Sequence, residues 1–347
     1  MFITWKPKKT YRSKPLRIRA HGGGVADRQS KIPGFSQEAL SRLTVLCTGA
    51  GGLGSHTGEC LARKGVGKLI LCDEDTVEPS NLNRQKFYRR DLWKNKAIRL
   101  ARNLAAESFL GTVVSGIPLN FTEAVDSGLV GRCDCIISGI DDELAREGIA
   151  EYALTAGIPL ITTAISGNGD SGYVHVQKPG EGCWRCAFPR ERKLRDDLAK
   201  YRAPCPGTPA IKDILMLVAG AAVYALDALF MHRPIAWNYR EFHLAGFMPD
   251  VVLRVERLPS CCMCGSAADK EGASVSPTRS LIAKSRLASE EMNLKVDGKT
   301  DCVIDVQTLQ AELVHRSVQL KVTGWGVGES GSIGLQSERN LSTVGVR

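Results

Sequence analysis

The sequence lacks an N-terminal apolar run: its first twenty residues, MFITWKPKKTYRSKPLRIRA, carry seven basic side chains. A secretory signal peptide needs an apolar segment of roughly 7–15 residues, so we expect a cytoplasmic protein. A membrane span of roughly 20 apolar residues is also missing. The longest charge-free apolar run, residues 214–226 (ILMLVAGAAVYAL), lies between Asp213 and Asp227. We interpret it as a core or dimer-interface helix and expect no membrane association.

Acidic residues are scarce at the amino end, and aromatic residues are scarce at the carboxyl end. Residues 1–35 contain nine Lys or Arg but one acid, Asp27, while the whole chain has a net charge of +9. The body is therefore near neutral, which argues against a nucleic-acid surface outside a basic arm, residues 1–25.

Residues 266–347 hold a single aromatic, Trp325. They are predicted to be an extension that is partly disordered or a small module, after one domain at 26–265.

Four short apolar runs rich in β-forming residues alternate with helix-like segments. The runs are residues 43–47 (LTVLC), 68–73 (KLILCD), 134–138 (DCIIS) and 159–163 (PLITT). Such alternation predicts an α/β fold with a Rossmann-like, doubly wound, mostly parallel sheet. A helix is expected from about Gly54 to Lys64, with Gly65 as its C-cap, and a longer amphipathic helix over residues 92–107.

Glycines follow the first predicted strand in the stretch TGAGGLGS. They are Gly49, Gly51, Gly52 and Gly54. Glycines there let the backbone approach phosphates, and the N–H groups of the next helix point at them. Asp73 ends the next predicted strand, where a carboxylate can bind ribose hydroxyls. These features predict a nucleotide site, but they fit a nicotinamide-dependent dehydrogenase equally well.

The segment that follows, DEDTVEPSNLNRQ, is crowded with polar and cationic residues that hydride transfer does not need. With two later positions, the candidates are Asp73, Asn81, Arg84, Gln85, Lys96 and Asp141. Adenylation requires cations against a triphosphate and a carboxylate for Mg²⁺. Any one of these residues could be a surface ion pair, but the set as a whole favours ATP and Mg²⁺ as ligands.

Twelve cysteines in an intracellular protein suggest reduced thiols, metal ligands or a nucleophile rather than disulfides. Two CxxC pairs occur, in KPGEGCWRCAFP and LPSCCMCG. They are Cys183 with Cys186, and Cys261 with Cys264. Four thiolates suit a tetrahedral, structural Zn²⁺. Cys262 is an alternative ligand, but only Cys261 has the two-residue spacing to Cys264.

Cys205 is a candidate nucleophile, in APCPGTPAIKD just before the apolar helix. A thiol near a helix N-terminus can have a lowered pKa and react readily. The competing interpretation is a bystander loop cysteine. Five other cysteines are expected to be inert, in or beside core elements: Cys47, Cys60, Cys72, Cys133 and Cys135.

Residues 27–265 resemble the adenylation domain shared by ubiquitin-activating enzymes and the sulfur-carrier adenylyltransferases of the molybdopterin and thiamin pathways. The matching motifs are RQ followed by GFSQEAL, then GAGGLGS, SNLNRQ, Lys96 and IDDELAR. The resemblance implies that Arg28 reaches the ATP of a partner subunit in a homodimer. It implies further that Asp73 binds ribose, that Arg84 and Lys96 bind phosphates, and that Asp141 ligates Mg²⁺.

Two positions depart from that family's usual residues. Asp142 stands where an Asn is usual, and Trp93-Lys94-Asn95 precede Lys96 where a glycine-led turn is common. The family also places a cysteine in the segment that contains Cys205, where it takes over the activated carboxylate as a thioester or takes part in sulfur transfer.

The activity implied is ATP-dependent adenylation of the C-terminal glycine of a ubiquitin-like protein, followed by a thioester on Cys205 and transfer to a conjugating enzyme. A sulfur-carrier β-grasp protein is the alternative substrate, for cofactor biosynthesis. Two further alternatives stay open: a tRNA-modifying dehydratase of the same superfamily, and a non-catalytic nucleotide-binding module. The two CxxC pairs and the near-neutral body argue against the dehydratase.

Overall fold

The computed structural model describes residues 9–15, 24–189, 209–231, 233–246 and 248–265, and the backbone of 292–296 and 300–304. The chain divides into two units, Met1–Ala273 and Ser274–Arg347. The second unit contains an antiparallel hairpin, β10 (Met292–Val296) and β11 (Thr300–Ile304), which the sequence analysis did not predict. Most of the basic arm and of the C-terminal extension lies outside the described residues.

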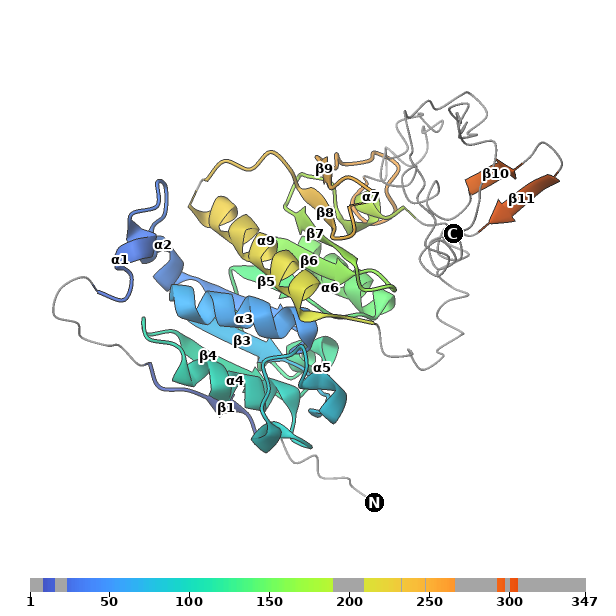
Figure 1. The fold of residues 1–347 in the computed structure, drawn as a ribbon. Helices are drawn as coiled ribbons and strands as arrows, with labels where there is room; N and C mark the ends of the chain where they lie inside the picture. The colour runs from blue at the N-terminus through green and yellow to red at the C-terminus, as the bar shows by residue number, and fades with distance from the viewer. Residues whose placement is uncertain are drawn as a thin grey trace, which may run out of the picture. The chain divides into compact units, whose positions relative to one another are not determined.

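A nine-stranded sheet organises the first unit, in the order β1-β4-β3-β2-β5-β6-β7-β8-β9 (Figure 1). The strands are β1 (Tyr11–Arg12), β2 (Thr44–Thr48), β3 (Lys68–Cys72), β4 (Val113–Ile117), β5 (Cys135–Ser138), β6 (Leu160–Ile165), β7 (Ser171–Gln177), β8 (Tyr239–His243) and β9 (Val251–Leu253). The five strands from β4 to β6 pair in parallel, which confirms the predicted parallel core. The other four pair antiparallel and make the sheet mixed.

Helices cover both faces of this sheet (Figure 1). They are α1 (Asp27–Ser30), α2 (Gln37–Arg42), α3 (Gly52–Lys64), α4 (Lys96–Ala106), α5 (Phe121–Asp126), α6 (Glu143–Ala156), α7 (Trp184–Ala187) and α9 (Lys212–Phe230), with two short 3₁₀ turns, η1 (Pro79–Asn81) and η2 (Arg89–Asp91). The crossovers that contain α3 and α4 step one way from β2, and the α6 crossover steps the other way. Right-handed crossovers therefore place α3 and α4 on one face and α6 on the other.

The ends of two helices follow local chemistry. Gly65 closes α3 with a left-handed φ of 86°, as predicted. Helix α4 begins at Lys96, four residues later than the expected start at residue 92. The cause is the preceding turn: Trp93 has a φ of 63°, and the Asn95 side chain caps the helix by accepting the Ile98 N–H at 3.0 Å.

Helix α9 is 19 residues long, so it is longer than its charge-free run and contains both Asp213 and Asp227. Among the described residues it is the one helix long and apolar enough to cross a membrane. However, ten of its residues are buried in the fold, where it packs against α3 and the sheet. This burial agrees with the predicted core helix.

Candidate active site

The glycine loop connects β2 to α3, and three of its four glycines are required by packing or backbone conformation. Gly49 has a left-handed φ of 85°. A Cβ on Gly54 would lie 1.9 Å from the Gly49 carbonyl oxygen, and one on Gly52 would lie 2.9 Å from Leu215. At Gly51 the nearest neighbour would be Gln85 Nε2, at 3.8 Å. Gly51 is therefore the least crowded of the four glycines, as close approach of a ligand requires.

The loop lies at the point where the strand order reverses. Strand β2 pairs with β3 on one side and β5 on the other, and the crossovers from these strands run in opposite directions. Open α/β sheets bind ligands at the carboxyl ends of strands at such a switch point. The topology therefore places the candidate site at the ends of β2, β3 and β5.

Asp73 follows β3 and ties the loop to the neighbouring strand. Its Oδ2 accepts the Ala50 N–H at 2.6 Å, and its Oδ1 accepts the Asp75 N–H at 2.8 Å. Burial raises the pKa of this carboxyl, while the charge of Lys96 and the Ala50 hydrogen bond act to lower it. Lys96 Nζ lies 2.8 Å from Asp75 Oδ2, with 12% of its side chain exposed. The Lys96 ammonium and the carboxylates of Asp73 and Asp75 therefore lie together at the edge of the sheet where the parallel strands end.

Residues 81–85 lie beside the glycine loop and use their polar groups in different ways. Asn81 is buried, and its Oδ1 accepts the Glu78 N–H at 3.0 Å, so this side chain stabilises its own turn. The Arg84 guanidinium donates to the Ser80 carbonyl at 2.5 Å and to Asn83 Oδ1 at 3.0 Å. Gln85 Oε1 is buried and has no hydrogen-bond partner among the described residues. An unpaired buried acceptor beside an open loop suits a ligand-binding site.

Two adjacent aspartates after β5 have different roles. Asp142 caps α6, because its side chain accepts the Ala145 N–H at 2.7 Å. Asn and Asp cap equally well, which accounts for the departure at this position. Asp141 is exposed, and the preceding Ile140 contacts the glycine loop, 3.1 Å from a Cβ built on Gly49. Asp141 therefore stands beside the loop and is available to a ligand.

Arg28 lies in α1, away from its own chain's glycine loop. Its neighbour Gln29 donates to the Lys64 carbonyl at 2.9 Å, at the far end of the 13-residue helix α3. That helix is about 20 Å long at 1.5 Å per residue, and Figure 1 shows α1 and α2 together beyond one end of α3. The exposed Arg28 side chain is thus about a helix length from the site that the other candidates form.

Cys205 lies outside the described residues, so its predicted role stays a prediction. Four of the five cysteines expected to be inert are buried, and Cys60 is half-buried. Burial raises the pKa of Cys47 to about 12 and the pKa of Cys133 to about 11. Their thiols are protonated at neutral pH and are poor nucleophiles.

The two CxxC pairs are far apart in sequence but lie side by side in the fold, where they form one cluster. Their four Sγ atoms all lie within 4.8 Å of one another. Cys183 Sγ is 3.7 Å from Cys186 and 3.5 Å from Cys261, and Cys186 is 3.4 Å from Cys264. Four sulfurs at 2.3 Å from a tetrahedral Zn²⁺ would stand about 3.8 Å apart. The cluster could hold zinc, and it contains Cys261, whereas Cys262 is exposed.

Buried polar contacts connect this cluster to α6. Arg185 lies between the cysteines of the first pair, and its guanidinium forms a double hydrogen bond with Glu147 of α6, 2.7 Å from Nε to Oε1. Gln177 accepts the Trp184 N–H at 2.8 Å and donates to the Ala150 carbonyl at 2.9 Å. The sequence analysis missed these residues, because the pairing becomes visible only once α6 and α7 are packed.

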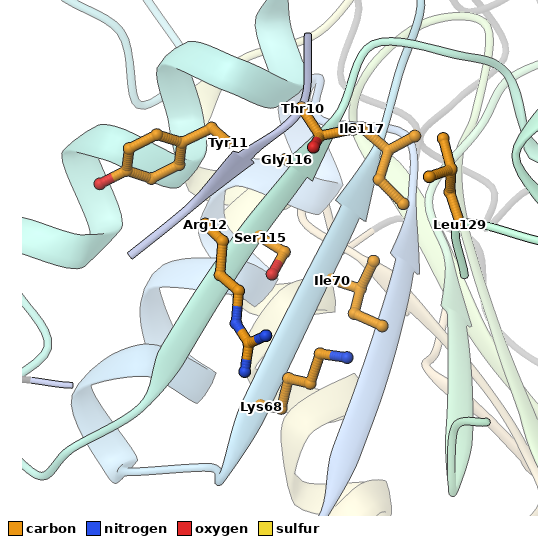
Figure 2. Close-up of a pocket in the computed structure, with 9 residues that line it drawn as sticks. All are labelled: Thr10, Tyr11, Arg12, Lys68, Ile70, Ser115, Gly116, Ile117 and Leu129. Carbon is orange, nitrogen blue, oxygen red and sulfur yellow. The ribbon is translucent and has the colours of Figure 1, made fainter. Parts of the chain in front are cut away.

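A separate small cavity, about 180 Å³, opens along the edge of the sheet at β1, β4 and β3. Figure 2 shows its lining, in which Arg12 and Lys68 extend along the same side of the strands as Ile70 and Ile117. None of the nucleotide-site candidates lines it. It is therefore distinct from the glycine loop.

The fold and these two groups of residues define a Rossmann-like α/β protein with a glycine loop at the switch point and a four-cysteine cluster. The chain belongs to the ThiF family, whose model matches residues 26–261. It is 28% identical to molybdopterin-synthase adenylyltransferase of Escherichia coli, over 69% of this chain and 95% of that enzyme. It is 30% identical to ubiquitin-like modifier-activating enzyme 5 of Dictyostelium discoideum, over 44% of this chain and 43% of that protein.

Solved structures agree on the fold. The crystal structure of E. coli MccB with ATP superposes with a TM-score of 0.56 at 24% identity, covering 66% of this chain and 68% of that one. At this level of identity the likeness establishes a shared fold alone. The family assignment and the fold therefore rest on independent comparisons.

Proposed function

We propose that this protein uses ATP to adenylate the C-terminal glycine carboxylate of a ubiquitin-like or sulfur-carrier β-grasp protein. The observation that carries the proposal is the open glycine loop at the switch point, bordered by Arg84, Lys96 and Asp141. A cationic rim with an exposed carboxylate suits a metal-bound triphosphate better than a nicotinamide. The relationship to adenylyltransferases supports the same reaction.

In the proposed reaction a carboxylate oxygen of the partner attacks the α-phosphorus of ATP, and the bond from this phosphorus to the bridging oxygen of pyrophosphate breaks. The products are an acyl adenylate and pyrophosphate, and no protein nucleophile is consumed. Lys96 and Arg84 would neutralise charge on the phosphates, and Asp73 would orient the ribose. Asp141 would hold Mg²⁺, which supplies further charge neutralisation when bound.

For the next step we propose that the Cys205 thiolate attacks the acyl carbon of the adenylate, which forms a thioester, breaks the bond from that carbon to the phosphate oxygen and releases AMP. The acyl group then passes to a thiol of a conjugating enzyme. The sulfur-carrier alternative has comparable support, since the chain aligns with 95% of the E. coli molybdopterin-synthase adenylyltransferase. A Cys205→Ser variant separates these fates from simple release. If that variant still carries the partner on a thiol-reducible bond, Cys205 is not the acceptor.

We further propose a homodimer in which Arg28 serves the partner subunit's site. Its distance from its own loop supports action in trans. Helix α9 also exposes an apolar stripe, with Met216 54%, Leu217 40% and Tyr224 37% accessible, which a second copy would cover. Mixing Arg28→Ala with Asp141→Asn subunits should restore part of the activity, because each mixed dimer retains one intact site.

The test of the reaction is ATP–pyrophosphate exchange by the purified protein at fixed Mg²⁺, with candidate partners that either keep or lack the terminal glycine. Exchange should require the glycine and should fall at least 100-fold in Asp141→Asn. The matched control is Asp142→Asn, which keeps the helix cap and should exchange normally. Exchange in Asp141→Asn at the level of the control would refute the assigned role, and no exchange in the wild type would favour a non-catalytic protein.

A further inference from the structure

The first two turns of α3 hold the backbone of residues 84–86. His56 Nε2 lies 2.8 Å from the Arg84 carbonyl oxygen. Ser55 Oγ accepts the Lys86 N–H at 3.3 Å, and the Lys86 ammonium lies 2.6 Å from Glu59 Oε1. Three contacts therefore hold two residues of this segment, Arg84 and Lys86, against the helix that begins at the glycine loop.

His56 contacts the backbone of Arg84, one of the candidate site residues. The chemistry of the two groups fixes which of them donates the hydrogen bond. A carbonyl only accepts hydrogen bonds, so Nε2 must carry the proton and donate it. His56 is 4% exposed. An unpaired carbonyl at a buried contact costs more than the bond itself gains, so removal of the imidazole would release the Arg84 backbone.

Two ligand-facing groups depend on this backbone. Among the described residues, the Arg84 guanidinium donates hydrogen bonds only within its own turn, to the Ser80 carbonyl and to Asn83 Oδ1, so its position follows that of its main chain. The next residue, Gln85, places its amide at the open side of Gly51. A shift at the Arg84 carbonyl would therefore displace the guanidinium and the Gln85 side chain together.

We propose that His56 is a positioning residue, whose hydrogen bond to the Arg84 carbonyl holds Arg84 and Gln85 beside the glycine loop and thereby sets nucleotide affinity. The inference rests on the proposed function only in naming ATP as the nucleotide. The contact itself is independent of catalysis.

The surroundings of the ring favour its neutral form. Burial lowers the pKa of His56, the Arg84 contact opposes this, and Lys212 and Lys86 lower the pKa further while Glu59 raises it. The ring is therefore neutral at pH 7. As the pH falls through this lowered pKa, a cation forms among lysines at a helix N-terminus, which disfavours it. The imidazolium would still donate from Nε2 to the Arg84 carbonyl, so the contact should survive protonation.

The experiment compares His56→Gln, His56→Leu and the control Thr57→Val, a buried neighbour whose hydroxyl has no partner among the described residues. Gln can place an amide N–H near the position of Nε2, whereas Leu cannot donate.

Amide hydrogen exchange of a peptide spanning residues 80–92 measures the protection of the segment directly, and calorimetric titration with ATP measures affinity. His56→Leu should raise exchange at residues 85–87 and the Kd for ATP about tenfold, the size of one lost hydrogen bond. His56→Gln and Thr57→Val should remain within about twofold of wild type.

The pH series supplies a readout that loss of packing would not change. Between pH 7.5 and 5.5 the wild type should lose no more affinity for ATP than His56→Gln, because protonation of the ring leaves the Nε2–H donor in place. Unchanged amide exchange and Kd in His56→Leu would overturn the proposal, as would a Gln variant as defective as the Leu variant. Absence of pyrophosphate exchange with every partner would defeat the proposed function alone, because the amide-exchange comparison would still decide the role of His56.

Discussion

The glycine-loop edge and the four-cysteine cluster both contain groups that can bind ligands. They differ in how many of those groups are exposed or lack a partner among the described residues. At the loop edge, Gln85 Oε1 has no described partner and Asp141 is exposed. At the four-cysteine cluster, Cys183 and Cys186 are 0% and 1% exposed and pack against the second pair. Structural zinc sites are closed, whereas reactive sites keep positions free. The exposure of these groups therefore distinguishes the loop edge, which we propose binds nucleotide, from the cysteine cluster, which we expect to stabilise the fold.

The largest effect should come from the four-cysteine cluster. Cys186→Ala removes one of four thiolates, so we expect loss of zinc and a cooperative loss of the folded state at physiological temperature, because metal binding to such sites supplies folding free energy. Elemental analysis and thermal denaturation measure both, and a strong chelator should reproduce the effect in the wild type. Cys262→Ser is the control and should keep about one zinc per chain. Equal zinc content in the two variants would contradict the four-cysteine assignment.

The next effect concerns the link between the four-cysteine cluster and α6. Glu147→Gln breaks the buried pair with Arg185, and leaving a buried charge unpaired should lower the free energy of unfolding by about 3–5 kcal/mol. Urea denaturation measures this, with the exposed Glu151→Gln on the same helix as the control. The double variant Glu147→Met with Arg185→Met should regain most of the loss, since it removes both charges. A double variant less stable than Glu147→Gln would show that the pair itself stabilises the fold.

At the loop edge, two glycine substitutions should separate packing from ligand access. Gly54→Ala forces a Cβ against the Gly49 carbonyl and should cost about 1–3 kcal/mol. Gly51→Ala places its methyl group in ordinary contact with Gln85, 3.8 Å from Nε2, and should cost less than about 1 kcal/mol, yet weaken ATP binding about tenfold because it fills the approach to the backbone. Denaturation and calorimetric titration provide the comparison. If Gly51→Ala binds ATP normally, the open side of the loop does not face the nucleotide.

The smallest expected effect on stability concerns the two adjacent aspartates, whose substitutions should have opposite consequences for stability and activity. Asp142→Ala removes the cap of α6 and should cost about 1 kcal/mol of stability, with pyrophosphate exchange within about twofold of wild type once folded. Asp141→Ala should do the reverse, with near-normal stability and little exchange. Parallel denaturation and exchange assays check the pair. Loss of exchange in both variants at full folding would mean that the turn, rather than Asp141 alone, is required.

Local patterns predicted the parallel half of the sheet well. The first four apolar runs match β2, β3, β5 and β6 to within two residues at either end, because buried parallel strands are short and continuously apolar. Strand β4, with the sequence VVSGI, was missed because Ser115 and Gly116 interrupt its apolar character. The antiparallel strands β7 to β9 include polar and charged residues, such as Arg240 and Glu241 in β8, and give a weaker signal.

By itself the sequence determined the features that depend on neighbouring residues: the parallel strands, the glycine loop, the Gly65 cap and the two CxxC pairs, since short-range geometry and ligand chemistry define each of them. Tertiary structure decided everything that joins distant segments. It brought the two cysteine pairs together, placed Arg28 at the far end of α3, assigned Asp142 to a helix cap beside an exposed Asp141, and paired Arg185 with Glu147. It also set His56 against the Arg84 carbonyl. These contacts join residues 28 to 78 positions apart, except for the Asp142 cap, and only the packing of helices on the sheet makes them close.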